Sequence, residues 1–315
     1  MSELRFDDVR VRYGSHRRGL TAVDGASLVV PSGRIVGLVG ESGSGKSTLA
    51  RAAVGLAPIS SGQITLDGTD VRRLPRRDRP LQMIFQDPYS SLDPRLTIGE
   101  SIGEAMPAGT DRRAEAARLL ELVHVDPSRA AMLPRELSGG QRQRVAMARA
   151  LAGKPKVVIA DEITSALDVS VQGAVLNLVR DLQQQFHLSI LFISHNLAVI
   201  RYLCDIVAVM YLGRIVEVGP TLEVLADPRH PYTRELLEAA PSKTRTLLAG
   251  DLDAAGEIDV PDPHDPPSGC RYHTRCAIGP VQRQDRDVCR TTDPAAGVLS
   301  HRWAACHFAD ELTTR

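Results

Sequence analysis

The sequence lacks any long apolar run. No stretch approaches the ~20 apolar residues that a helix needs to cross a bilayer, and residues 1–11 are charged and alternating, without the apolar centre of a secretory signal. An excess of charge of one sign is also absent, because 38 basic residues balance 38 acidic ones. The composition argues against a membrane-spanning chain and against a nucleic-acid binder. It predicts a cytoplasmic protein, either soluble or peripheral to a membrane.

The apolar residues that are present predict an α/β fold. They form 43% of a chain of 315 residues, enough for one large domain with an appendage. Short β-branched runs predict strands, and segments of helical spacing separate several of them, which indicates a mostly parallel sheet covered by helices. The expected strands lie at 35–39, 63–67, 81–86, 157–160 and 190–194, and the expected helices at 49–56, 112–123 and 171–186.

The composition changes near residues 235–245, after which Pro, Asp, Gly and Arg dominate. We therefore expect a main domain at 1–240 and a C-terminal extension at 241–315. The extension has too few apolar residues for a large core of its own. To be ordered it needs a cross-link, such as a bound metal, or the surface of a partner. The four cysteines at 270, 276, 289 and 306 offer such a cross-link.

Residues 40–48 read Gly-Glu-Ser-Gly-Ser-Gly-Lys-Ser-Thr and match the phosphate-binding loop G-x-x-x-x-G-K-[ST]. The motif follows a predicted strand and opens a predicted helix, which argues against a merely flexible loop. Glycines let backbone N–H groups point at phosphate oxygens, and the helix N-terminus adds positive charge. Lys46 is expected to reach the β- and γ-phosphates and Ser47 to bind Mg²⁺. The residues expected to contact ATP are Gly40, Ser42, Gly43, Gly45, Lys46, Ser47 and Thr48.

A second element places two carboxylates after an apolar strand, in Val157-Val158-Ile159-Ala160-Asp161-Glu162. Ligands of α/β proteins lie at the carboxyl ends of strands. We expect Asp161 to hold Mg²⁺ and Glu162 to act as general base on the attacking water. Two adjacent carboxylates are by themselves more often surface charge, and the phosphate loop is what favours catalysis.

Between these elements, Leu137-Ser138-Gly139-Gly140-Gln141 resembles the signature loop of the ABC ATPase family. Further motifs of the family occur along the chain in the order that the family has them, and the resemblance extends from residue 4 to about 235. It implies a P-loop NTPase fold of the ABC type, with a mixed sheet core, an antiparallel β subdomain and a helical subdomain at about 87–150. The marks are Tyr13 where an aromatic stacks on adenine, Gln86 of the Q-loop, Ser165 to Asp168 of the D-loop, and the switch histidine His195.

The resemblance also implies roles for these residues. Gln86 and His195 would join Glu162 in catalysis, and Gln86 would join Ser47 and Asp161 in binding Mg²⁺. Two domains would pack head to tail, with ATP between the phosphate loop of one and the signature loop of the other. Each residue alone has a plainer explanation, such as a strand-edge aromatic or a helix cap. The residues implied on the facing subunit are Ser138, Gly139, Gly140, Gln141 and Asp168.

One position departs from the family pattern. The family usually has Pro after the catalytic glutamate, whereas this chain has Ile163. No ligand is lost, so we expect activity to survive. The pose of Glu162 and the rate are the properties that this change affects.

The type of ABC protein is indicated by the domain content of the sequence and by motifs other than those that bind ATP. Soluble ABC proteins acting on ribosomes or DNA carry two nucleotide domains or coiled coils, and the sequence has neither. Residues 86–94, 230–233 and 266–270 resemble the peptide and nickel importer branch, closest to the second ATPase of dipeptide/oligopeptide systems. The resemblance implies a homologous ATPase partner, with a heterodimer favoured over a homodimer, two permeases and an extracytoplasmic solute-binding protein. It places this ATPase at the cytoplasmic face of the membrane. Tyr89, Leu92 and Leu96 are candidate permease contacts, with ordinary subdomain packing an equal alternative.

The cysteines of the extension form the last pattern. Cys270, Cys276, Cys289 and Cys306 resemble a C-terminal segment that holds a [4Fe–4S] cluster in some peptide-importer ATPases. Four thiolates also suit Zn²⁺, His273 and His307 are spare ligands, and unligated thiols are a third possibility. The gap at 277–288 is longer than usual, and we interpret it as a looped-out insertion. Cys204 is assigned to the core.

Overall fold

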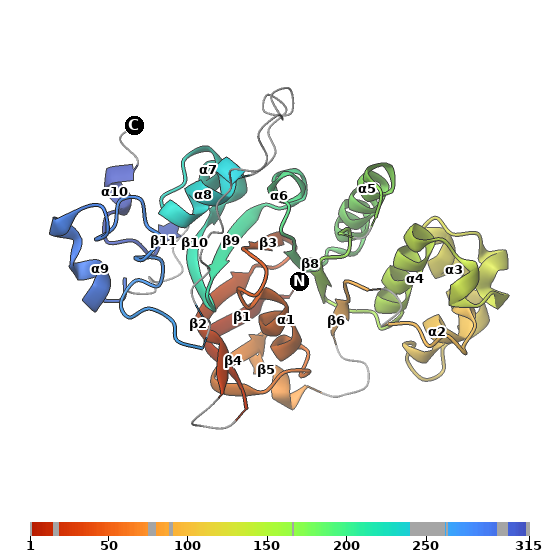
Figure 1. Cartoon of the computed structure of the whole chain (residues 1–315). Helices are drawn as coiled ribbons and strands as arrows, with labels where there is room; N and C mark the ends of the chain where they lie inside the picture. Colours follow the sequence, from red (N-terminus) through yellow and green to blue (C-terminus); the bar gives the residue numbers. More distant parts are fainter. Residues whose placement is uncertain are drawn as a thin grey trace.

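The computed structural model describes residues 2–14, 19–74, 80–87, 91–165, 167–239, 262, 264–294 and 302–312. The strands fall into a four-stranded and a seven-stranded sheet (Figure 1). The first has the order β2-β1-β4-β5 and is antiparallel throughout. Its strands are β1 (Leu4–Tyr13), β2 (Leu20–Val30), β4 (Ile59–Leu66) and β5 (Thr69–Asp70).

A bulge explains the imperfect alternation of apolar residues in β1. Leu4 and Phe6 are buried, and the next buried residues, Val9 and Val11, are out of step with them. The register with β2 shifts between Phe6 and Val9, and Asp8 takes the left-handed conformation with φ 45°. The extra residue keeps both halves of the strand facing the core.

The larger sheet has the order β11-β10-β9-β3-β8-β7-β6. Its five strands from β9 to β6 are mutually parallel, while β10 and β11 add antiparallel partners at one edge. This mixed sheet, beside the antiparallel four-stranded one, confirms the predicted α/β class and matches the two sheets that the resemblance implies. The strands are β3 (Ile35–Val39), β6 (Leu81–Ile84), β7 (Val157–Asp161), β8 (Ser189–Ile193), β9 (Ile206–Tyr211), β10 (Arg214–Pro220) and β11 (Trp303–Ala304).

Helices connect and cover the strands. Helix α1 follows β3, and α5 joins β7 to β8, as the alternation predicted. The helices near the sheets are α1 (Lys46–Ala53), α5 (Val169–Phe186), α6 (Leu197–Leu203), α7 (Thr221–Ala226) and α8 (Pro231–Ala239). The extension adds two single turns, α9 (Val288–Thr291) and α10 (Ala309–Leu312).

A separate helical group consists of α2 (Ile98–Glu104), α3 (Arg112–Leu122) and α4 (Gly139–Ala152), and it lies at the right of Figure 1, apart from α1. Two local patterns in the sequence set its helix starts. Thr97 and Glu100 form a capping box at the start of α2, and Ser138 with Gln141 forms one at α4. Within the described ranges no helix combines the length and apolarity needed to cross a membrane.

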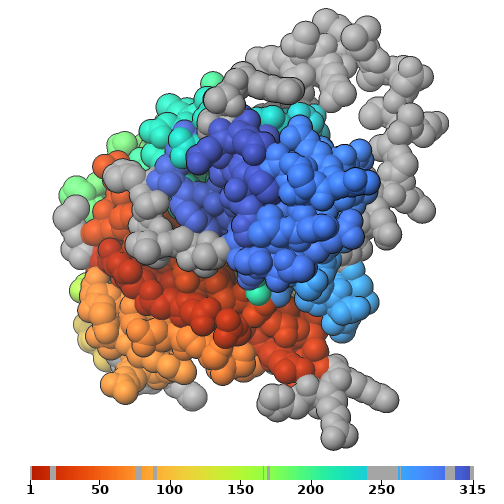
Figure 2. All heavy atoms as spheres, turned by 90° about the vertical axis from the view of Figure 1, so that its left-hand side faces the viewer, coloured from red at the N-terminus to blue at the C-terminus, as the bar shows by residue number. Residues whose placement is uncertain are grey.

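The C-terminal extension uses the surface of the main domain as its support. Tyr272, Cys276 and Ala305 belong to the main hydrophobic core, and Trp303 pairs with Val218 of β10. Figure 2 shows the extension, in blue, lying against the N-terminal strands and the region of α7 and α8. A segment with few apolar residues is thereby ordered by a core that it does not build alone.

Candidate nucleotide-binding site

The phosphate loop joins β3 to α1, as the motif predicted. Two of its glycines are required by close contacts. A Cβ on Gly40 (φ 153°) would lie 2.1 Å from the carbonyl oxygen of Met210, and one on Gly45 (φ 105°) would lie 2.4 Å from that of Ala22. Neither backbone oxygen can move aside cheaply, so only glycine fits at these positions.

Lys46 begins α1 and is held by the loop itself. Its Nζ donates hydrogen bonds to the carbonyl oxygens of Gly40 (2.8 Å) and Glu41 (2.7 Å), and the residue is only 5% exposed. Burial lowers the pKa of the ammonium, while the charges of Glu162, Asp161 and Glu41 act in the opposite direction. The cation is therefore positioned inside the loop, near three carboxylates.

Ser47 and Asp161 meet between α1 and β7. The Ser47 hydroxyl donates a 2.9 Å hydrogen bond to Oδ1 of Asp161, which is 2% exposed. Burial raises the pKa of Asp161, and the hydrogen bond from Ser47 offsets part of that effect. Hard oxygen donors of this kind suit Mg²⁺, so the pair fits the ion expected from the sequence.

Glu162 and His195 follow the ends of the neighbouring strands β7 and β8. Nδ1 of His195 lies 3.5 Å from Oε2 of Glu162. Glu162 takes the left-handed conformation with φ 47°, which is uncommon for a residue with a Cβ, and its N–H donates to the carbonyl of Ile193. Six other non-glycine residues share this conformation, so it is the contact with His195, and not the backbone alone, that marks Glu162 as a candidate site residue.

Ile163 anchors the chain after Glu162. Its side chain is 2% exposed and belongs to the main core. The residue that departs from the family pattern therefore packs inward, directly after the left-handed Glu162.

Gln86 lies beyond β6, not at its end. The strand was expected to reach residue 86, but its ladder with β7 stops where Ile84 faces Ala160. Gln86 is exposed, and its Nε2 donates to Ser165 Oγ at 3.4 Å. Ser165 in turn donates to the carbonyl of Glu162 at 2.9 Å. The Q-loop glutamine thus contacts the segment that follows the two carboxylates.

The signature loop does not join these residues within one chain. Ser138 caps α4, which lies in the separate helical group of Figure 1, away from α1. A Cβ on Gly140 would lie 2.5 Å from Cγ1 of Val171 in α5, so this glycine is needed for packing. Gln141 completes the capping box and also accepts a hydrogen bond from Arg129.

The remaining expected site residues lie at element ends. Tyr13 is the last residue of β1 and is 39% exposed. Asp168 is the N-cap residue of α5. Leu92 is 2% exposed and belongs to the core, which favours the packing alternative for this residue. Tyr89 and Ala166 lie outside the described residues.

Two residues beside the phosphate loop, Tyr232 and Arg275, were missed. The N–H of Glu41 donates to the Tyr232 hydroxyl at 2.8 Å, and Arg275 of the extension forms an ion pair with the Glu41 carboxylate. The signal was present in His230-Pro231-Tyr232-Thr233, which the sequence marked as a family feature without a role. The buried carboxylate of Glu217 fixes this motif by accepting from the N–H groups of Arg229 and His230.

The four cysteines of the extension line one small pocket, together with His273 and His307. Burial raises the pKa of Cys270 and Cys276 to about 11 and that of Cys306 to about 12. Four thiols are a suitable donor set for iron–sulfur or zinc. As placed, however, the described His, Cys, Asp and Glu residues include no group of three that could hold a metal ion.

The segment at 277–288, interpreted from the sequence as a looped-out insertion, is mostly exposed and is tied back at Arg286. Arg286 is 4% exposed, lies 3.4 Å from the centre of the Phe308 ring and forms a 2.7 Å ion pair with Glu311. These two contacts hold the segment in place, because a buried guanidinium needs an aromatic face or a carboxylate to compensate its charge. Cys204 is buried in the core, as expected.

Comparisons with known proteins agree with this site. The ABC transporter family model matches residues 23–165, and the oligopeptide/dipeptide transporter C-terminal region model matches residues 216–280. A peptide import ATP-binding protein of Brucella ovis is 45% identical over 298 residues, with 90% of each chain covered. The di/tripeptide transport ATP-binding protein DppF of Pseudomonas aeruginosa is 43% identical, with 92% of this chain and 91% of the relative covered.

Solved structures show the same architecture. The dimer of the ATP-binding cassette MJ0796 in a post-hydrolysis state with ADP and Pi is 27% identical, with a TM-score of 0.61 over 69% of this chain and 98% of that one. The cbiO1 protein of Clostridium perfringens is 26% identical, with a TM-score of 0.62 over 71% of this chain and 90% of that one. The chain belongs to the ATP-binding, ATP-hydrolysing subunits of ABC transporters, in the branch that carries the oligopeptide/dipeptide transporter C-terminal region.

Proposed function

We propose that this ATPase energises a bacterial importer of di- and oligopeptides, and that the residues around its phosphate loop form the ATP site. One observation carries the site assignment. Lys46, Ser47, Asp161 and Glu162 converge at the carboxyl ends of β3 and β7, although the sequence separates them into two distant segments. Ligands of α/β sheets bind at this edge.

The chemistry of each side chain sets its proposed role in binding or hydrolysing ATP. The loop N–H groups and Lys46 bind the β- and γ-phosphates, with Gly40, Ser42, Gly43, Gly45 and Thr48 shaping the cradle. Ser47, Asp161 and Gln86 hold Mg²⁺, which would neutralise phosphate charge. Glu162 takes the proton of the attacking water, and the 3.5 Å contact with His195 orients its carboxylate. Tyr13 stacks on the adenine.

The second half of each ATP site comes from another subunit. The signature residues Ser138, Gly139, Gly140 and Gln141 lie at the start of α4, apart from the phosphate loop of the same chain (Figure 1). A helix N-terminus suits an anionic phosphate. We propose that these residues and Asp168 face the ATP of a homologous partner, with a heterodimer favoured over a homodimer. Loss of the γ-phosphate then releases the two subunits.

A cleft at the helical group fits the permease contact. It lies between β6, α2 and α4, and both polar and apolar side chains face it. We propose that a short helix of a permease docks there, which places the subunit at the cytoplasmic face of the membrane. The lining residues include Gln82, Met83, Glu104, Met106, Arg112 and Arg149.

The extension carries the remaining cofactor. We propose that Cys270, Cys276, Cys289 and Cys306 hold a [4Fe–4S] cluster, with Zn²⁺ as the alternative. Their shared pocket supports this, although a bound cluster requires the thiols to rearrange. A structural role is favoured, because the extension has few apolar residues to order it.

Peptide is the proposed solute because the relatives are named as peptide, dipeptide or tripeptide transport proteins. The test reconstitutes the chain with its partner ATPase, permeases and solute-binding protein in liposomes. Dipeptide is expected to stimulate ATP hydrolysis, and Lys46→Ala to abolish it. Stimulation by Ni²⁺ instead would favour the nickel alternative. Hydrolysis that responds to neither solute would favour a different small solute or a soluble, non-transport ATPase.

A further inference from the structure

Arg275, in the segment between Cys270 and Cys276, reaches the phosphate loop. Its Nη1 and Nη2 donate to Oε2 and Oε1 of Glu41, both at 3.2 Å, so the ion pair is bidentate. Nη2 also donates to Glu235 of α8. The contact joins residues 234 positions apart, and Glu41 is the second residue of the phosphate-binding motif.

The surroundings of Arg275 make this contact specific. Its side chain is 10% exposed, and its guanidinium lies 5.9 Å from the ring centre of Tyr211 and 5.8 Å from that of Tyr272. Tyr232, which accepts the Glu41 N–H, packs against both rings. Bidentate pairing over aromatic faces is a role for arginine that lysine cannot reproduce.

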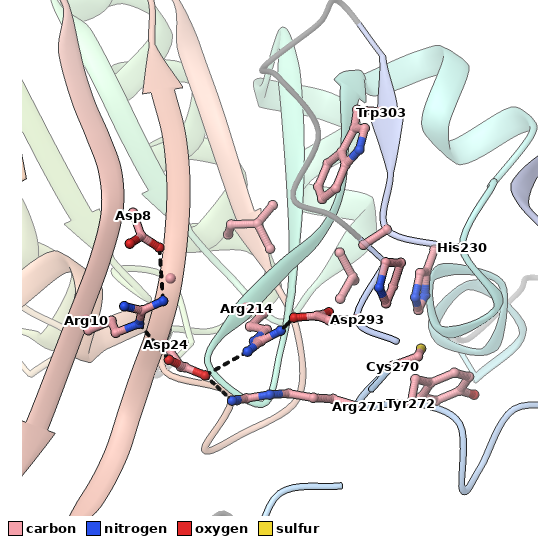
Figure 3. Close-up of a pocket in the computed structure, with 15 residues that line it drawn as sticks. Asp8, Arg10, Asp24, Arg214, His230, Cys270, Arg271, Tyr272, Asp293 and Trp303 are labelled. Carbon is pink, nitrogen blue, oxygen red and sulfur yellow. Dashed lines mark hydrogen bonds and ion pairs between the residues drawn. The ribbon is translucent and has the colours of Figure 1, made fainter. Parts of the chain in front are cut away.

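A second arginine of the same segment supports the other side of the loop. Arg271 forms an ion pair with Asp24 of β2. Asp24 also forms ion pairs with Arg10 and Arg214, as Figure 3 shows. Arg271 donates as well to the carbonyl of Leu212. The next residue, Gly213, donates its N–H to the carbonyl of Ser44 in the phosphate loop at 2.8 Å. The segment between two cysteines thus supports the loop at both its beginning and its middle.

The charge of Glu41 gives this contact a consequence for nucleotide binding. Nζ of Lys46 donates a 2.7 Å hydrogen bond to the backbone carbonyl of Glu41, so Glu41 lies beside the ammonium that is proposed to bind the phosphates. A carboxylate in this loop opposes the binding of a triphosphate, and the opposition is strong where solvent is partly excluded. A neighbouring cation that pairs with the carboxylate removes most of this repulsion.

We propose that Arg275 is a positioning residue of the ATP site, which neutralises and orients Glu41 so that the phosphate loop accepts the triphosphate. The C-terminal extension is therefore part of the nucleotide-binding apparatus. This inference rests on the proposed assignment of residues 40–48 to ATP.

The test measures the dissociation constants of Mg-ATP and Mg-ADP by calorimetry on the full-length chain. Arg275→Gln is expected to weaken ATP binding roughly tenfold, and ADP binding less, because ADP carries less charge. Arg275→Lys retains a charge but not the bidentate pair, so it should fall between. Glu41→Gln added to Arg275→Gln should restore ATP binding to within about twofold of Glu41→Gln alone.

Controls separate the possible failures. Arg283→Gln removes a more exposed arginine of the same extension and should leave ATP binding unchanged. Lys46→Ala should abolish binding, and if it does not, the proposed site itself is wrong. If Lys46→Ala loses binding while Arg275→Gln binds normally, the inference alone is wrong. It is also wrong if the double variant binds as weakly as Arg275→Gln, because the arginine then only holds the extension in place.

Discussion

The hydroxyl of Ser47 donates a 2.9 Å hydrogen bond to Oδ1 of Asp161, which lies 114 positions further along the chain. This contact joins the first turn of α1 to the end of β7. Both groups have an oxygen atom that can coordinate a metal ion, and the carboxylate is almost fully buried. The pair defines where Mg²⁺ is expected, so it gives the most direct test of the metal assignment.

Asp161→Asn keeps the size of the side chain and removes its charge. We expect the affinity for Mg²⁺ in the presence of ATP to fall roughly 10- to 100-fold, since a positioned carboxylate that orients metal-bound water has about this effect. ATP hydrolysis titrated with Mg²⁺ provides the measurement. Asp70→Asn, at an exposed ion pair with Arg72, is the control. An unchanged Mg²⁺ requirement would remove Asp161 from the site.

Glu162→Gln tests the general base. The variant retains the shape of Glu162 but cannot take a proton, so hydrolysis should slow at least about 100-fold while ATP binding persists. Because the γ-phosphate then remains in place, the closed dimer should accumulate, and gel filtration with Mg-ATP detects it. Wild-type turnover would show that another group activates the water.

Ile163→Ala tests the packing that follows the strained Glu162. Ile163 is 2% exposed, so truncation should lower the free energy of unfolding by about 2 to 5 kcal/mol. Urea denaturation measures this change. Leu56→Ala, at a residue 61% exposed, should change it by less than about 0.5 kcal/mol. If the two losses were equal, Ile163 would not be the anchor described above.

His230 predicts a pH dependence of stability. Burial lowers its pKa from 6.5 to about 3, so the folded protein keeps it neutral while the unfolded chain takes up a proton below pH 6.5. Stability from this residue is therefore present above pH 6.5 and declines as pH falls toward 3, by about 1.4 kcal/mol per pH unit. Comparing urea unfolding across this range for the native chain and His230→Gln should show a shallower slope in the variant. Leu56→Ala, at an exposed residue that does not titrate, should keep the native slope.

Iron and sulfide analysis of anaerobically purified protein tests the cysteine site. A cluster predicts about four iron and four sulfide per chain, whereas zinc predicts one metal ion and no sulfide. Cys289→Ser should lower the bound metal, while Cys204→Ser, in the core, should not. A metal-free protein that remains folded would leave the four cysteines as thiols only.

Local patterns predicted much of the fold and the site. The helix that opens at the phosphate loop and the strand before Asp161 follow from a few neighbouring residues, and each is confirmed. Contacts between residues that are far apart in the sequence could not be predicted in this way. The pairing of Glu41 with Arg275 depends on where a segment with few apolar residues comes to lie, and no periodicity encodes that. The left-handed conformation of Glu162 is likewise marked by no glycine or other local signal in the sequence.

The pairing of β11 with β10 has a consequence for solubility. Trp303 and Ala304 occupy the outer side of β10, at the margin of the seven-stranded sheet. A chain shortened before residue 302 would leave backbone groups of β10 without these neighbours. Open strand margins recruit strands from other molecules, so a shortened protein is expected to self-associate into precipitates even where its ATPase fold stays intact.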